Sequence, residues 1–181
     1  DEFIKSFKSH VEAINVGDGL DSKSTMGPLV ADRRLEVMED FISDAVSSGG
    51  EVISGGGRGQ SPGSFFEPTL IRDVPDTAKI MIEEPFGPVA PSASFSSIDE
   101  IIERANSLPF GLASYAFTSN PRTSQILKSE IESGMLAINS MHIHSVETPF
   151  GGLKHSGYGY EGSIEGLEAF LVTKYSSEIY T

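Results

Sequence analysis

The stretch LASYAFTSNPRTSQILKSEIESGMLAIN, residues 112–139, places a polar, helix-like run between two apolar runs. LASYAFT and MLAIN have the length and apolar content of strands, and MLAIN is predicted to be fully buried. The run between them predicts a helix, with Asn120 as its N-cap and Pro121 at its first position. A strand, a helix and a strand in this order are typical of a parallel pair joined by a crossover. The stretch therefore predicts an α/β fold.

The same alternation continues on both sides of this stretch. We expect a mainly parallel sheet with flanking helices, in which Pro68 places its strand at an edge or a bulge. Ser97 is the expected N-cap of the helix that follows it. Helices are predicted over residues 2–14, 32–48, 98–108 and 164–170, and strands over residues 51–56, 65–71, 89–95 and 171–180. The last strand follows a compact unit with no sheet of its own, so we expect it to pair with another chain.

Composition excludes several classes of partner. Of 181 residues, 38% are hydrophobic and 22% are charged, which is typical of a globular chain. The formal charge of −13 disfavours nucleic acid and anionic lipid, because both need basic patches. No apolar run approaches the roughly 18 residues of a membrane span, and the N-terminus lacks a signal peptide. We expect a cytoplasmic protein, and Asp1 in place of Met leaves open whether it is a natural start.

The chain has no cysteine, which excludes disulfides, thiolate metal sites and a cysteine nucleophile. The Gly-rich run GGGRGQ, residues 55–60, favours a hairpin loop over a phosphate loop, because no Lys-Ser/Thr pair or helix follows it. Ser156 lacks the Gly-x-Ser-x-Gly spacing of a hydrolase nucleophile.

Two histidines, His142 and His144, flank Ile143, and on a strand they would share a face and could bind a metal. No third ligand is evident, although Glu147 is close in sequence. We therefore expect these histidines to belong to a pocket wall or to the surface, and we expect no metal site.

The stretch EEPFGPVAP, residues 83–91, sets two acids directly against a rigid turn. Pro85 and Pro88 restrict the backbone on both sides of Phe86. The Glu84 carboxylate can accept hydrogen bonds from two neighbouring hydroxyls, as acidic residues do with ribose, and Phe86 can pack on a flat ring. Acidic residues are mostly exposed, so a solvated turn is the alternative. The residues alone leave both interpretations open.

Six stretches in order carry a resemblance to a known family: GDGLDSKSTMGPLV, FFEPTLI, EEPFGPVAP, LPFGLASYAFTSN, GMLAIN and PFGGLKHSGYGYEGS. Together they resemble the C-terminal portion of the NAD(P)-dependent aldehyde dehydrogenase superfamily, and most closely its succinate-semialdehyde dehydrogenase-like members. The resemblance covers essentially all 181 residues.

The resemblance implies roles for four residues and shows one departure from the family pattern. Glu84 is similar to the glutamate that binds the nicotinamide-side ribose, and Phe86 to the phenylalanine near the nicotinamide ring. Phe150 is similar to the aromatic residue that lines the aldehyde pocket, and Ser145 to a serine that helps to hold the substrate carboxylate. His144 replaces a small residue, so the resemblance leaves the identity of the aldehyde open, and it does not distinguish NAD from NADP.

The resemblance also implies a division of the chain. Residues 1–150 correspond to an α/β unit of the catalytic domain, and residues 151–170 to a Gly-rich segment and helix returning toward the cofactor domain. Residues 171–181 correspond to an oligomerisation strand, which implies self-association.

Members of this family oxidise an aldehyde to the acid with a cysteine thiolate and a water activated by a glutamate. In the family, both residues and most of the dinucleotide fold precede the matched segment. The resemblance therefore implies no catalytic residue here, and we expect the isolated chain to be inactive. The alternative is a non-catalytic oligomerisation or interaction module that has kept the fold.

Overall fold

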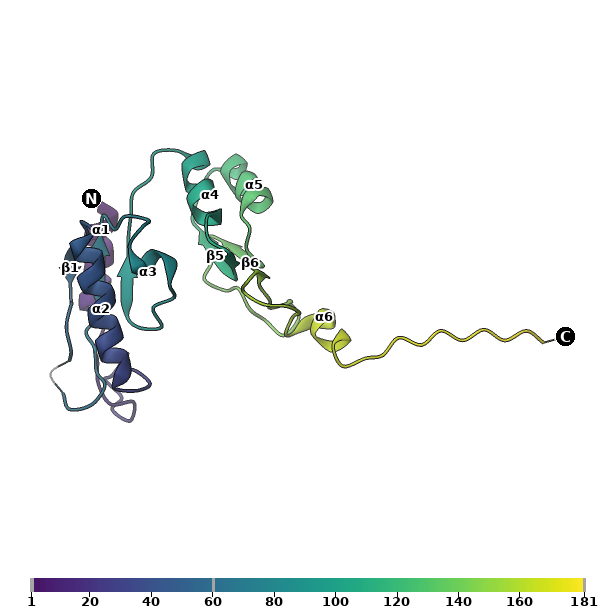
Figure 1. The fold of residues 1–181 in the computed structure, drawn as a ribbon, viewed down its shortest axis with the longest axis horizontal. Coiled ribbons are helices and arrows are strands. Elements are labelled where there is room, and N and C mark those ends of the chain that lie inside the picture. The colour runs from purple at the N-terminus through teal and green to yellow at the C-terminus, as the bar shows by residue number, and fades with distance from the viewer. Residues whose placement is uncertain (1, 60, 181) are drawn as a thin grey trace. The chain divides into compact units, whose positions relative to one another are not determined.

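The computed structural model describes residues 2–59 and 61–180 (Figure 1). Its contacts divide the chain into two compact units, the first ending at Ser94 and the second beginning at Phe95. Asp1, Gln60 of the Gly-rich loop and Thr181 of the expected oligomerisation strand lie outside the described residues. No helix in the described part of the chain is both long and apolar enough to span a membrane.

The first unit is a three-stranded sheet with helices. Its strands lie in the order β1-β2-β3, with β1 and β2 antiparallel and β2 and β3 parallel. Its elements are α1 (Glu2–Glu12), α2 (Arg33–Ser47), β1 (Glu51–Ser54), β2 (Thr69–Arg72), α3 (Lys79–Ile82) and β3 (Val89–Pro91).

The core of the first unit forms where one face of α2 meets the residues around β2. Leu35, Met38 and Ile42 recur every three or four positions, so they lie on one side of the helix and are buried. They belong to a single apolar cluster with Phe66 and Ile71. Burial of this stripe is what holds α2 in place.

The second unit contains the crossover that the sequence predicts. Its elements are α4 (Ile98–Asn106), β4 (Phe110–Gly111), β5 (Ala113–Ala116), α5 (Pro121–Glu130), β6 (Met135–Ile138), β7 (Leu153–Lys154) and α6 (Ser163–Glu168). Strands β5 and β6 are parallel, with α5 between them in the chain, and β4 pairs antiparallel with β7.

Both predicted helix caps are confirmed. Asn120 accepts hydrogen bonds from the backbone amides of Arg122 (2.9 Å) and Thr123 (3.4 Å), and Pro121 occupies the first position. The Ser97 side chain accepts from the Glu100 amide at 3.2 Å. Each cap satisfies an amide that the helix itself leaves without a partner.

The α/β class is confirmed, but the mainly parallel sheet is wrong. The described strands form three small sheets, and two of their four pairings are antiparallel. The edge position expected from Pro68 is also wrong, because β2 is the central strand of its sheet. Pro68 immediately precedes the paired residues, so the ladder does not need its missing amide. The irregularity lies opposite, in β1, where the register shifts between Val52 and Ser54.

Two further strand expectations need correction. Strand β6 alternates buried and half-buried residues and is not buried throughout. Residues 171–180 form no strand within the described chain, and their apolar side chains, such as Val172 and Tyr175, are exposed. A strand needs a neighbouring edge to bond to, and the described residues of this single chain provide none to residues 171–180. Their pairing with another chain stays a prediction, as does the division at residues 150 and 170.

The turn between α3 and β3 is held at three backbone points, two of them against α2 and one against β2. The Arg34 guanidinium donates to the Pro85 carbonyl. Gly87 lies against Met38, so that a Cβ on this glycine would be 2.2 Å from the Met38 Sδ. The Thr69 amide donates to the Pro88 carbonyl at 2.8 Å. Residues 85–88 are therefore part of the packed first unit.

We expect Gly87→Ala to lower the free energy of unfolding by about 1–3 kcal/mol, because the added Cβ would lie 2.2 Å from the Sδ of the fully buried Met38 and would force that side chain to shift within the core. Urea unfolding followed by circular dichroism measures the change. Gly27→Ala is the matched control, since nothing lies within 4 Å of the added Cβ, and it should stay within about 0.5 kcal/mol of wild type. Equal unfolding midpoints for the two variants would contradict the packing of this turn.

Candidate functional site

The first group of candidate residues lies in the turn that α2 holds. Glu84 and Phe86 both project into solvent, and Phe86 is 74% exposed. None of the described residues forms a hydrogen bond or ion pair with Glu84, so its carboxylate oxygens are available as acceptors. The structure thus places an unpaired acid and an uncovered aromatic ring two residues apart.

The backbone of Phe86 distinguishes this turn from an ordinary solvated loop. Phe86 has a φ of +44°, in the left-handed region that bulky residues rarely adopt. Such strain persists only where the surroundings enforce it, and it is frequent at ligand sites. Here the enforcing contacts are those of Arg34 and Met38, one on each side of Phe86.

This arrangement fits part of a nucleotide. A free carboxylate can accept hydrogen bonds from both hydroxyls of a ribose, and an exposed ring can pack on a planar base. A turn that only needed to face water would require neither the strained phenylalanine nor its supports. The geometry is compatible with the ligand interpretation of residues 83–91, which stays a prediction.

The second group lies in the loop of residues 139–150, in the second unit. Asn139 holds the start of this loop. Its side chain accepts from the Thr118 amide and donates to the Thr118 carbonyl, both at 2.8 Å. Phe150 holds the end, through two backbone hydrogen bonds with Glu161, also at 2.8 Å. The loop is therefore fixed at both ends.

Within this loop, Ser145 is engaged by two neighbours. Its hydroxyl donates to the Glu147 carboxylate at 2.8 Å, and its amide donates to the Thr148 Oγ1 at 2.9 Å. The Ser145 hydrogen bond holds the pKa of Glu147 below its usual value, because it stabilises the ionised carboxylate. The carboxylate beside Ser145 is thus kept negatively charged.

His144 and Phe150, two residues expected in one pocket, are in contact. Their ring centroids are 5.5 Å apart and the ring planes meet at 87°, an edge-to-face arrangement. His142, His144, Ser145 and Thr148 line a hollow of about 480 Å³ beside the start of β6. The structure therefore brings His144 and Ser145 to one hollow and sets the Phe150 ring against His144, while Phe150 itself lines a separate hollow with residues of the 151–161 segment.

The strand geometry considered for a metal site is absent. Residues 142–144 are not in a strand, so the alternation that would put both imidazoles on one face does not apply. Among the described residues there is no group of three or more His, Cys, Asp or Glu side chains arranged to hold a metal ion.

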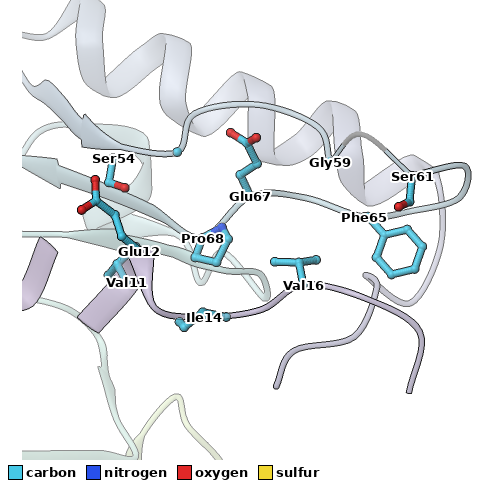
Figure 2. Close-up of a pocket in the computed structure, with 11 residues that line it drawn as sticks. Val11, Glu12, Ile14, Val16, Ser54, Gly59, Ser61, Phe65, Glu67 and Pro68 are labelled. Carbon is cyan, nitrogen blue, oxygen red and sulfur yellow. The ribbon is translucent and has the colours of Figure 1, made fainter. Parts of the chain in front are cut away.

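Sequence reasoning missed a second hollow, of about 420 Å³, in the first unit. Figure 2 shows it between the end of α1 and the Gly-rich hairpin, with Glu12 and Ser54 near one end and Phe65 near the other. Its lining comes from segments about 50 residues apart, and no local pattern marks them. Glu12 is paired with Lys8 at 3.5 Å, and the hollow shows no chemistry that distinguishes a ligand.

Comparison with known proteins gives a consistent match. The model of the aldehyde dehydrogenase family matches residues 1–176. A probable succinate-semialdehyde dehydrogenase [NADP(+)] of Sinorhizobium fredii is 43% identical over 174 residues, which are 96% of this chain and 35% of that protein. A glutarate-semialdehyde dehydrogenase of Pseudomonas aeruginosa is 41% identical over 175 residues, or 97% of this chain and 36% of that protein.

The fold agrees with a solved structure of the same kind. A succinate-semialdehyde dehydrogenase from Burkholderia pseudomallei superposes with a TM-score of 0.93 at 35% identity, covering 95% of this chain and 36% of that one. The chain thus spans about a third of the length of the relatives it matches.

Proposed function

The chain belongs to the aldehyde dehydrogenase family, and on this premise we propose that it is the C-terminal portion of an NAD(P)-dependent enzyme. That enzyme oxidises an aldehyde to the carboxylic acid, and succinate semialdehyde is the candidate substrate. The order of six motifs along the chain supports the C-terminal placement. The bound cofactor supplies the acceptor for the hydride that the aldehyde loses.

One observation carries the proposal: the strained turn that presents Glu84 beside Phe86. The proposal assigns Glu84 to the hydroxyls of the nicotinamide-side ribose and Phe86 to the neighbourhood of the nicotinamide ring. The absence of a hydrogen-bond or ion-pair partner for Glu84 among the described residues, and the exposure of Phe86, support these assignments. Nothing in this turn distinguishes NAD from NADP.

The loop of residues 139–150 is assigned to the aldehyde. Phe150 and His144 form an aromatic wall, and Ser145 lies next to them in the same loop. The relatives named above act, by their names, on semialdehydes of succinate and glutarate. Both substrates carry a carboxylate at the end opposite the aldehyde, which supports a substrate of this kind.

We expect Glu84→Gln, made in the full-length enzyme, to raise the KM for NAD(P)⁺ by about tenfold to a hundredfold. The change weakens hydrogen bonds made to a charged acceptor, each of which contributes about 1.5–3 kcal/mol. Glu83→Gln is the matched control, because Glu83 is equally exposed and adjacent, and it should change KM less than about twofold. Steady-state kinetics with varied cofactor measures both. Similar effects at the two glutamates would contradict the assignment.

The isolated 181-residue chain should not oxidise aldehydes, because it contains no cysteine and no other side chain here supplies a thiolate. Mixed with succinate semialdehyde and NAD⁺ or NADP⁺, it should give no absorbance rise at the NADH wavelength. Turnover would contradict this. The gene sequence upstream of the Asp1 codon distinguishes an enzyme from the alternative, a non-catalytic module. A coding region that contains the cysteine nucleophile would support the enzyme, and a start codon near Asp1 would support the module.

Residues 171–180 are proposed to add as a strand to the sheet of a second copy in the cytoplasm. They are extended, carry exposed apolar side chains and have no strand partner among the described residues. Light scattering should show the chain to be associated at high concentration, and truncation after Phe170 should reduce the association. A monomeric full chain would count against this role.

A further inference from the structure

We propose that His144, and not Ser145, supplies the main hydrogen-bond donor for an anionic group at the far end of the aldehyde. The group is a carboxylate or a sulfonate, which share the same acceptor chemistry. This inference rests on the proposed function and names the residue that selects its substrate class.

Ser145 is poorly placed to donate to an incoming anion. A serine has one O–H donor, and that of Ser145 already points at the Glu147 carboxylate, 2.8 Å away. The Ser145 amide is also used, by the Thr148 Oγ1 at 2.9 Å. Both donors of the residue that the family resemblance favours are therefore committed inside the loop.

Glu147 adds a charge of the wrong sign. Its lowered pKa keeps it ionised, and it lies within hydrogen-bond distance of Ser145. A substrate carboxylate that approached the Ser145 hydroxyl would meet this negative charge at short range, and like charges at such distances repel. Binding at Ser145 would require the anion to displace Glu147 from its hydrogen bond.

His144 has the opposite properties. An imidazole carries at least one N–H donor in either protonation state. No described residue forms a hydrogen bond with the ring nitrogens of His144, and its ring contact is with Phe150. The edge-to-face packing, with centroids 5.5 Å apart, orients the ring without using its donors.

The hollow beside this loop is suited to a polar end group. His142 lines the same space of about 480 Å³, so a second imidazole lies near the donor of His144, whereas the Thr148 hydroxyl already donates to the Ser145 carbonyl at 3.1 Å. Without the imidazole N–H, an anion in this hollow would lose a hydrogen-bond donor and would still be repelled by the Glu147 carboxylate. The preference for an anionic aldehyde should then fall and a neutral aldehyde should be favoured.

The test compares two four-carbon aldehydes in the full-length enzyme, succinate semialdehyde and neutral butanal. His144→Phe keeps a ring against Phe150 and removes the N–H donor. We expect it to raise the KM for succinate semialdehyde by about tenfold or more while that for butanal changes less than about threefold. His144→Gln, which keeps a donor, should recover part of the loss. Ser145→Ala should raise the first KM less than His144→Phe, and Glu147→Gln should lower it.

Three results would overturn the inference. A larger rise of the KM for succinate semialdehyde in Ser145→Ala than in His144→Phe would assign the main donor to Ser145. An equal rise of both KM values in His144→Phe would show that His144 shapes the pocket without binding the anionic group. A wild-type enzyme that oxidises butanal in preference to succinate semialdehyde would refute the anionic substrate, here and in the proposed function, and would leave only the oxidation of an aldehyde standing. Failure to oxidise either aldehyde would refute both proposals.

Discussion

The contact between α2 and the turn at residues 85–88 is the constraint on which the first unit's candidate site depends. The helix is fixed by its own buried stripe, and it meets the turn through Met38 and Arg34. Because Gly87 has no side chain, the backbone comes close enough to Met38 for the turn to be packed. A packed turn can hold Phe86 in a backbone conformation that a loop in water would leave. The exposed carboxylate of Glu84 is presented from this rigid support.

The loop at residues 139–150 is also ordered, but by hydrogen bonds and not by packing against a helix. It has little apolar burial, and its order comes from hydrogen bonds at Asn139 and Phe150 and from those among Ser145, Glu147 and Thr148. A loop held in this way is adaptable, since each hydrogen bond contributes only about 1 kcal/mol net. That suits the proposed role of its side chains in substrate selection, whereas the packed turn of the first unit suits the proposed contact with the cofactor.

Local patterns identified most of the elements, because their causes are local. The caps at Ser97 and Asn120 and the crossover through α5 depend on residues adjacent in sequence, and the structure has all three. The sheet was harder to predict, since strand pairing joins residues far apart. The prediction that β2 is an edge strand was wrong for this reason. Pro68 shows only that its own position has no amide donor, and this position lies just before the paired residues of β2. The strand expected at residues 171–180 has no partner in the described chain, and a strand is a property of two segments.

The sequence by itself determined the α/β class, the family and the short stretches that contain the candidate residues. Apolar spacing, helix capping and motif order depend only on the order of residues along the chain. Tertiary structure decided how those residues are held and which groups they contact. Only the folded chain shows that Phe86 is strained, that Ser145 is bonded to Glu147, and that the ring of His144 stands against Phe150. The physical reason is that strain, hydrogen-bond commitment and ring orientation depend on which groups meet, and groups meet only when the chain has folded.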